Sequence, residues 1–203
     1  MRLTAVILAA VTVLLPIVAQ AQFSFAPGSY QLANGAKGTA SLKLVLAENS
    51  NPTVLAGTKN GRERKFRSAE LTSFTIENHR FIRVNDFRFR SGADANFREP
   101  TFLEIAETGP VELFYYYYLV EMGPNFKAHV KLPVLRKAGA NLFFAYNPSH
   151  TPGFDQKLAP SAFVATLFPA DLVLQRQLAA NGISRQQIAA VVQAYNKGVR
   201  LTP

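Results

Sequence analysis

Residues 111–120, VELFYYYYLV, form the stretch that decides the fold of this chain. Successive side chains of a β-strand point to opposite faces of the sheet, and both faces of this stretch are apolar. One face carries Val111, Leu113, Tyr115, Tyr117 and Leu119, and the other carries Phe114, Tyr116, Tyr118 and Val120. A strand that is apolar on both faces lies inside a sheet and is covered twice. We therefore predict a central strand, with sheet, helix or a partner packed on each face.

Shorter alternating segments on either side of this stretch predict further strands. Residues 126–132 alternate apolar side chains with Lys and His, and residues 42–46 place Leu at every second position. Asn34-Gly35 and Asn78-His79 are turn signals, because asparagine and glycine tolerate positive φ. We predict about ten strands, mainly antiparallel and arranged as a barrel or sandwich, with residues 90–100 as a polar loop.

The end of the chain changes to a helical pattern. Pro169 has the position of a helix start and Asn181-Gly182 that of a helix stop. A second helix follows, with Ser184 and Gln187 at the spacing of a capping box and Gly198 as its end. Strands followed by a helical hairpin predict an α+β fold.

The N-terminus has the three parts of a secretory signal peptide. Arg2 supplies positive charge, residues 3–18 are mostly apolar, and Ala19-Gln20-Ala21 is a small-x-small cleavage site. The apolar run is short for a membrane-spanning helix, which needs roughly 20 residues, and it contains Pro16. We predict that the chain is exported and that no transmembrane segment remains after cleavage. The predicted division is a signal peptide over residues 1–21, a β-rich domain over residues 22–160 and a helical region over residues 161–203 that packs on the sheet.

The composition restricts the classes to which the protein can belong. The chain has no cysteine, which excludes a disulfide scaffold, a thiolate metal site and a cysteine-linked lipid anchor. Its formal net charge is +9, and removing residues 1–21 leaves +8. Such an excess raises the affinity for polyanions, but it also keeps a protein in solution. The charge alone therefore names no partner.

Basic residues gather in the first half of the chain. Arginine forks suit phosphate and carboxylate groups, and cations on neighbouring strands form one surface. The alternative is that the phenylalanines between these cations are core and the cations are their solvated back face. The candidate binding residues for an anionic partner are Lys59, Arg62, Arg64, Lys65, Arg67, Arg80, Arg83, Arg88 and Arg90.

No motif in the sequence indicates catalysis or metal binding. The three histidines lie at no metal-ligand spacing, and no serine sits in a G-x-S-x-G elbow. Glu104, Glu107 and Glu112 flank the turn at Gly109-Pro110, and we expect solvated acids there rather than a carboxylate pair for glycoside hydrolysis. We expect no enzyme activity, no metal, no cofactor and no specific nucleic acid partner.

Residues 30–76 resemble small SH3-like or Sm-like barrels. They run as a strand, the Asn34-Gly35 turn, Gly38, a strand, a short strand and then Glu70-Leu71 leading into Phe74-Thr75-Ile76. The resemblance implies a bent five-stranded meander for this part of the chain.

The chain after residue 21 is also similar to a group of uncharacterised exported β-rich proteins of Bacteroidetes bacteria. It departs from their pattern at Ala36, where an acidic residue is usual. The resemblance implies a Gram-negative envelope location and carries over no molecular function. The matching segments are Gly28-Ser29-Tyr30, Asn34-Gly35 with Gly38, residues 109–117 and Tyr195-Asn196.

These observations favour an exported binding or structural module of the cell envelope, in the periplasm or outside the cell. Its basic surface would engage an envelope protein or an anionic polymer. The alternative is a carrier that holds a small, lipid-like ligand in the cavity of a β-barrel or sandwich. The tyrosines at 115–118 alternate in direction, so we expect burial in the central strand rather than a shared binding cleft.

Overall fold

The computed structural model describes residues 24–47, 50–57, 62–85, 87–91, 93–97, 100–123, 126–146, 160–180 and 182–199. These residues form a mainly antiparallel sheet followed by short helices, which confirms the α+β class. The strands are β1 (Ala26–Leu32), β2 (Lys37–Ala47), β3 (Ser50–Gly57), β4 (Glu63–Phe66), β5 (Leu71–Ile76), β6 (His79–Val84), β7 (Phe87–Ser91), β8 (Ala93–Phe97), β9 (Thr101–Glu107), β10 (Val111–Gly123), β11 (Phe126–Lys137) and β12 (Phe143–Ala145). The helices are the 3-10 helix η1 (Ser68–Glu70), α1 (Pro160–Ala165), α2 (Leu172–Ala179) and α3 (Ile188–Asn196).

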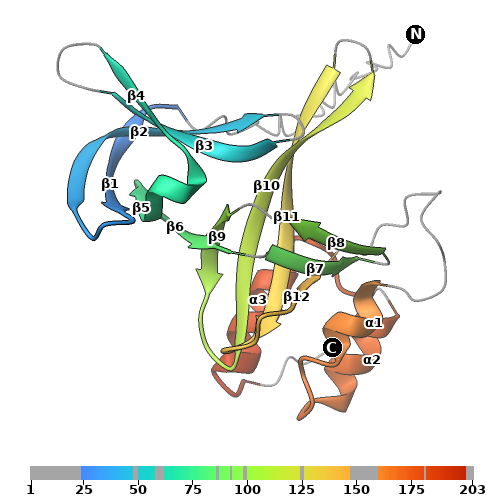
Figure 1. Cartoon of the computed structure of the whole chain (residues 1–203). Helices are drawn as coiled ribbons and strands as arrows, with labels where there is room; N and C mark the ends of the chain where they lie inside the picture. The colour runs from blue at the N-terminus through green and yellow to red at the C-terminus, as the bar shows by residue number, and fades with distance from the viewer. Residues whose placement is uncertain are drawn as a thin grey trace, which may run out of the picture.

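Within the described residues, the strands form a single sheet of twelve in the order β4-β3-β2-β1-β5-β6-β9-β10-β11-β12-β7-β8. The pairing of β12 with β7 is parallel, and the other described pairings are antiparallel. In Figure 1 the first five strands curl at one end of the molecule and the three α-helices lie at the other, with the long hairpin of β10 and β11 between them.

Strands β1 to β5, which we call the meander, curl because β5 returns past η1 to pair with β1. The predicted turn at Asn34-Gly35 is confirmed: Gly35 has a φ of +87°, and the Leu32 N–H donates to the Ala36 carbonyl at 2.8 Å. Tyr30 of β1 and Phe66 of β4 lie three strands apart in the sheet, yet their ring centroids are 5.0 Å apart. This contact spans the concave side of the curl.

The interior of the meander is filled by aromatic side chains. Phe74 stacks on Phe81 with ring centroids 4.5 Å apart and meets Phe102 edge-on at 4.9 Å. Phe66 and Phe81 are fully buried, and Phe74 and Phe102 are each 2% exposed. Burying a side chain of this size contributes about 2–3 kcal/mol, so this aromatic cluster adds substantially to the stability of the meander.

Strand β10 is the central strand that its sequence predicts. Leu113 and Phe114 point to opposite faces, and both are almost completely buried. Leu113 packs in a cluster with residues of the three α-helices. On the other face the ring centroid of Phe114 lies 5.6 Å from that of Phe143 of β12, and the ring centroid of Tyr116 lies 5.3 Å from that of Phe87 of β7. Helices therefore cover one face and returning strands cover the other.

The two predicted helices are present, but the first begins later than Pro169. The Asp171 side chain accepts a hydrogen bond from the Leu174 N–H at 2.9 Å, so Asp171 is the N-cap and the helix starts at Leu172. The predicted stop at residue 182 is confirmed, because the Gly182 N–H donates to the Gln177 carbonyl at 2.8 Å.

Helix α3 begins later than its predicted capping box, with Gln187 as its N-cap and no side-chain cap hydrogen bond, and it ends where Gly198 predicts. The Gln187 side chain accepts a hydrogen bond from the Ser184 N–H at 2.8 Å, which is the returning half of a capping box. At the other end Gly198 has a φ of +68°, and the Val199 N–H donates to the Ala194 carbonyl. This is the glycine-terminated Schellman arrangement.

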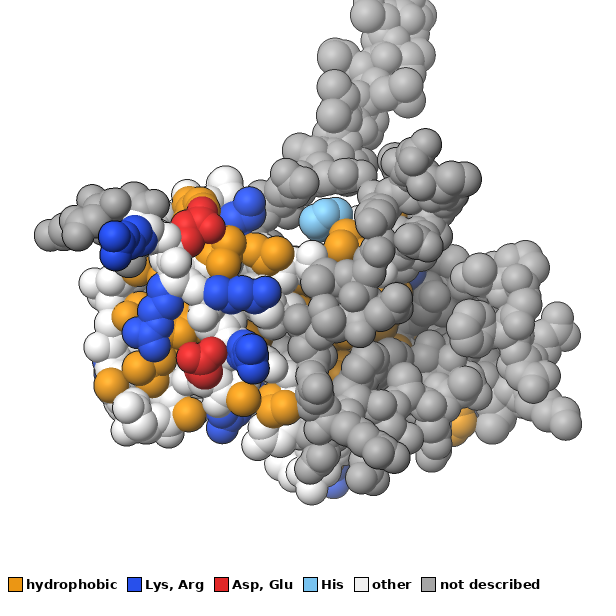
Figure 2. Space-filling model, turned by 45° about the horizontal axis from the view of Figure 1, so that its top comes forward, with side chains coloured by type: hydrophobic (Ala, Val, Ile, Leu, Met, Phe, Trp, Pro, Cys, Tyr) orange, Lys and Arg blue, Asp and Glu red, His pale blue; other side chains and the backbone are white. Residues whose placement is uncertain are grey.

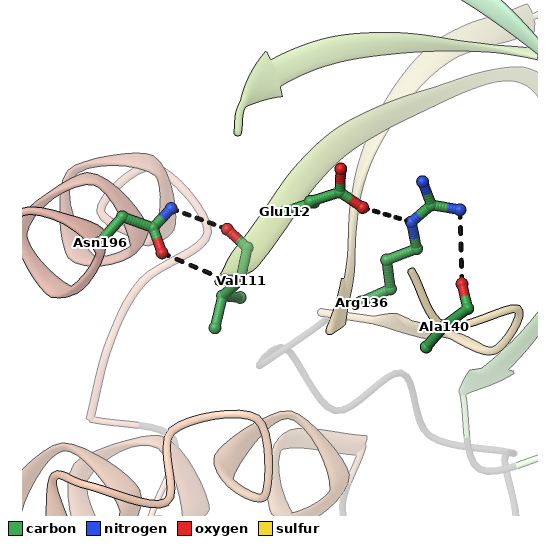
Figure 3. Close-up of polar contacts among 5 residues, drawn as sticks. All are labelled: Val111, Glu112, Arg136, Ala140 and Asn196. Atoms are coloured by element: carbon green, nitrogen blue, oxygen red, sulfur yellow. Dashed lines mark hydrogen bonds and ion pairs between the residues drawn. The ribbon is translucent and has the colours of Figure 1, made fainter. Parts of the chain in front are cut away.

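A single side chain, Asn196, fastens α3 to the start of β10 (Figure 3). Its Oδ1 accepts from the Val111 N–H at 3.1 Å, and its Nδ2 donates to the Val111 carbonyl at 2.7 Å. The side-chain amide thereby makes the two hydrogen bonds to Val111 that the backbone of a neighbouring strand would make. Gly109 makes room for it, since a Cβ there would lie 2.6 Å from the Asn196 side chain.

Two segments differ from their predictions. Residues 93–97 were expected in a loop but form β8, which pairs with β7 from Phe87 opposite Phe97 to Ser91 opposite Ala93. Backbone pairing outweighs the polar composition there. Helix α1 is an additional helix ahead of the two that the helical hairpin predicts, and it packs against β12 and α2. The predicted signal peptide lies outside the described residues.

Candidate functional site

A polar hollow of about 590 Å³ lies on the outer face of the meander, where β2, β1, β5 and β6 run side by side. Its walls carry hydroxyl, amide and cationic groups, and none of the described residues that line it is acidic. The polar side chains that line it are Ser29, Gln31, Lys37, Thr39, Ser73, Thr75 and Arg80.

The sheet register arranges these side chains in two rows. Thr39, Ser29, Thr75 and Arg80 face one another across four neighbouring strands. Lys37, Gln31 and Ser73 form the next row. Residues directly opposite on adjacent strands point to the same face, so the alternation that buries Phe74 and Leu42 inside the meander presents the hydroxyls outside.

The centre of the first row is preorganised. The Ser29 and Thr75 hydroxyl oxygens lie 2.8 Å apart, and Thr75 Oγ1 also accepts from the Ser29 N–H at 3.2 Å. Gly28 permits this close approach of β1 and β5, because a Cβ there would lie 2.2 Å from the Thr75 carbonyl oxygen. The row therefore has a fixed central pair with a cation at one end.

The two cations of the hollow, Lys37 and Arg80, are unpaired among the described residues. Within the described part of the chain, neither Lys37 nor Arg80 has an ion-pair or hydrogen-bond partner for its side chain, and both side chains are exposed. Unpaired cations beside hydroxyl groups, in a lining without acidic residues, attract an anion. This arrangement makes the hollow the candidate site.

Other cations of the sheet are already engaged. The Arg83 Nη1 donates to the Ala69 carbonyl at 2.9 Å. Lys131 lies 3.4 Å from the Glu104 carboxylate. Arg136 donates to Glu112 at 2.6 Å and lies over two phenylalanine rings (Figure 3). These three cations contact other parts of the protein, so they are not candidates for binding a ligand.

The structure separates the predicted basic residues. Arg64 and Lys65 are exposed on β4 at the edge of the sheet, and the Arg64 guanidinium lies 4.4 Å from the Phe66 ring. Arg80 and Arg83 are three positions apart on β6, so they point to opposite faces. Arg80 lines the hollow and Arg83 does not.

The remaining predicted residues do not extend the hollow. Arg62 and Arg67 are exposed on either side of β4. Lys59 and the side chains of Arg88 and Arg90 lie outside the described residues. Figure 2 shows Lys and Arg side chains spread over the face formed by the meander, with acidic side chains among them. The described part of this surface is basic but mixed.

No protein-family model, curated protein or solved structure matches this chain. Across the described residues, no helix has the length and apolar character of a membrane span, and no group of three or more His, Asp or Glu side chains is placed to hold a metal ion. The site is therefore argued from its own geometry.

A second polar cluster surrounds Glu104, and it corrects the expectation that this acid is solvated. Glu104 is only 6% exposed. Its carboxylate lies 2.6 Å from His79 Nδ1 and 3.4 Å from Lys131 Nζ, and it accepts a hydrogen bond from the Tyr117 hydroxyl. The Lys131 ammonium also lies 3.8 Å from the centroid of the Tyr115 ring. Because β9 places Glu104 opposite the buried Phe81, the carboxylate is buried, while His79 and Lys131 contact it from the solvent side.

Burial changes the acidity of the tyrosines in and near β10. It raises the pKa of Tyr116 to about 12, with a smaller contribution from Tyr118. Burial and the Glu104 carboxylate raise the pKa of Tyr117 well above its usual range. The same two causes, with Glu107, raise the pKa of Tyr115. The Tyr117 hydroxyl therefore stays protonated well into alkaline pH as the donor to Glu104.

Sequence reasoning found Arg80 and missed the rest of the hollow. Lys37 was overlooked because it stands alone, outside the basic cluster. A signal was present: the turn at Asn34-Gly35 pairs Gln31 with Lys37 and Ser29 with Thr39, so the outward positions nearest the turn are polar. Pairing of β5 with β1 is the step that the sequence does not reveal.

Proposed function

We propose that this chain is an exported, non-enzymatic binding module of the cell envelope, and that its hollow receives an anionic group of a partner or polymer. The observation that carries the proposal is the uncommitted pair Lys37 and Arg80 at the two sides of a hydroxyl-lined hollow. Export rests on the signal-peptide pattern of residues 1–21.

The chemistry of the lining suits an oxyanion. Arg80 offers a planar fork of N–H donors and Lys37 a compact ammonium. The serine and threonine hydroxyls of the lining, which donate and accept hydrogen bonds, lie between these two cations. Exposed cations also attract a polyanion over a distance, an effect that salt screens with a Debye length of about 8–10 Å.

The proposed relationship to SH3-like barrels has one line of support. The order β4-β3-β2-β1-β5, with η1 between β4 and β5, is compatible with a bent five-stranded meander. The likeness to exported Bacteroidetes proteins and the Gram-negative envelope location stay predictions from the sequence.

The carrier alternative requires an apolar cavity. In the meander that space is taken by Phe66, Phe74, Phe81 and Phe102, all at most 2% exposed. A lipid-like ligand would have to displace rings packed at 4.5–4.9 Å. The packing of these rings favours the surface hollow over an interior site.

The test is the retention of residues 22–203 on immobilised heparin as salt is raised. We expect Lys37→Gln with Arg80→Gln to lower the salt needed for elution and to reduce the slope of log affinity against log salt by about one for each cation. The matched control is Arg64→Gln with Lys65→Gln, which removes the same charge from exposed positions on β4. Equal effects of the two pairs would show that net charge alone binds the polymer.

A further inference from the structure

We infer that the ligand of the hollow is an acidic polysaccharide, bound across the strands with an anionic group at each side and sugar hydroxyls between. The inference rests on the proposed function and specifies its ligand. It follows from the mixture of groups in the lining and from their spacing.

The lining is richer in neutral hydrogen-bonding groups than in charge. Ser29, Thr39, Ser73, Thr75 and Gln31 separate the two cations. A ligand that carries charge alone, such as polyphosphate, leaves these groups facing water. A sugar chain offers hydroxyls that donate and accept in turn, which are the partners that hydroxyl and amide side chains need.

Several of these groups are available. Among the described residues, the side chains of Gln31, Thr39 and Ser73 make no hydrogen bond within the protein. Gln31 and Ser73 are half-buried, so a ligand that pairs with them removes groups from partial contact with water. Polar groups that are partly desolvated discriminate strongly between a ligand that pairs with them and one that does not.

The spacing indicates an extended ligand. Lys37 on β2 and Arg80 on β6 are separated by three strand intervals, which corresponds to about 14 Å between backbones. Their flexible side chains reach inwards from both sides. A single small oxyanion engages one of them, whereas an oligomer with repeated acidic groups engages both and lies along the row of hydroxyls.

Nucleic acid fits this lining less well. Readers of single strands stack bases on exposed aromatic rings. The aromatic residues that border the hollow are Tyr30 and Phe74, and both rings pack into the meander, Tyr30 against Phe66 and Phe74 against Phe81. Phe74 is 2% exposed. The bordering rings therefore provide no platform for a base.

The experiment compares four probes with residues 22–203 at fixed low salt: polygalacturonate, dextran, polyphosphate and oligothymidylate. Polygalacturonate has acids and hydroxyls, dextran has hydroxyls alone, and the last two have charge without sugar hydroxyls along the chain. The variant is Thr39→Val, which removes one hydroxyl at constant volume. Its matched control is Thr53→Val on the outer face of β3, outside the hollow. Binding is measured by titration calorimetry.

We expect polygalacturonate to bind most tightly and dextran weakly. Thr39→Val should weaken polygalacturonate binding about five-fold, leave polyphosphate binding unchanged, and exceed Thr53→Val in effect. Tighter binding of polyphosphate or oligothymidylate at equal charge, or equal effects of the two threonine variants, overturns the polysaccharide assignment and leaves the anion-binding proposal standing. Failure of all three polyanions to bind overturns both.

Discussion

The meander and the helix-covered part of the sheet, which comprises β9–β12 with α1–α3, both enclose buried aromatic clusters, but they treat their charged side chains differently. In the meander, the outer face over β2, β1 and β5 stays open and Lys37 has no partner among the described residues. In the helix-covered part, Glu112 binds Arg136 and Glu104 binds His79, Tyr117 and Lys131.

The difference separates two reasons for keeping charge in a fold. A paired, partly buried charge specifies how strands and helices meet, and its removal leaves the partner without compensation. An exposed and unpaired cation adds almost nothing to folding, so its removal affects binding without affecting stability if the proposed function is right. Measuring both the free energy of unfolding and polyanion binding, for variants of Glu104 and of Lys37, tests whether charges in the two regions have these different roles.

The largest expected effect is that of Glu104→Ala. The change leaves the Tyr117 hydroxyl and the His79 ring without their acceptor in a half-buried setting. Breaking a buried charge cluster costs 3–5 kcal/mol when both partners are buried. His79 and Lys131 reach solvent, so we expect about 2–3 kcal/mol from chemical denaturation.

The control for this prediction is Lys37→Gln, which should change the free energy of unfolding by less than about 0.5 kcal/mol. Its effect should appear in heparin retention instead. If Lys37→Gln destabilises the protein as much as Glu104→Ala, the cations of the hollow are structural and the contrast between the two regions disappears.

The sequence predicted the fold best where one pattern decides one element. The doubly apolar pattern of residues 111–120 identified the central strand, and Gly198 identified the end of the last helix. It failed for residues 93–97, because a polar strand of five residues is held by its neighbour's backbone rather than by its own pattern.

The candidate site was harder to predict because it depends on strands that are distant in the sequence. Arg80 was identified, whereas Ser29 and Thr75 come together only when β5 pairs with β1 across 46 positions. Glu104 was misjudged for the same reason: its partners come from β6, β10 and β11. Strand alternation gives the face of each residue and not its neighbours.

The next effect in size is that of Asn196→Ala, which removes the side chain that fastens α3 to β10. The Val111 N–H and carbonyl lose their partners at the end of the sheet, at a cost of about 2 kcal/mol. Hydrogen exchange should show faster opening of α3, with exchange in the meander unchanged. The control is Gln193→Ala, which removes an exposed contact with Glu107 one turn away. Uniform destabilisation of both regions would contradict the local role.

The smallest expected effect concerns alkaline pH and the tyrosines of the helix-covered part. Burial raises the pKa of Tyr146 to about 12, and its hydroxyl donates to the Ile183 carbonyl at 2.5 Å. The folded pKa exceeds the unfolded value of 10, so the stabilisation is complete below pH 10 and is lost as the pH rises towards 12. A shift of one pKa unit corresponds to about 1.4 kcal/mol, so we expect this residue to account for about 1 kcal/mol of lost stability between pH 8 and pH 11.

Tyr146→Phe separates this titration from the lost hydrogen bond. The variant is less stable at pH 8, because the Ile183 carbonyl loses its donor, but it should lose about 1 kcal/mol less than the wild type on going to pH 11, as measured by denaturation at both pH values. Equal pH dependence of the two proteins would mean that Tyr146 ionises in the folded state as it does in the unfolded chain. The buried contact between this tyrosine and the loop before α3 would then open in alkali without unfolding, and the helical layer would be more loosely held to the sheet than the packing of its aromatic residues indicates.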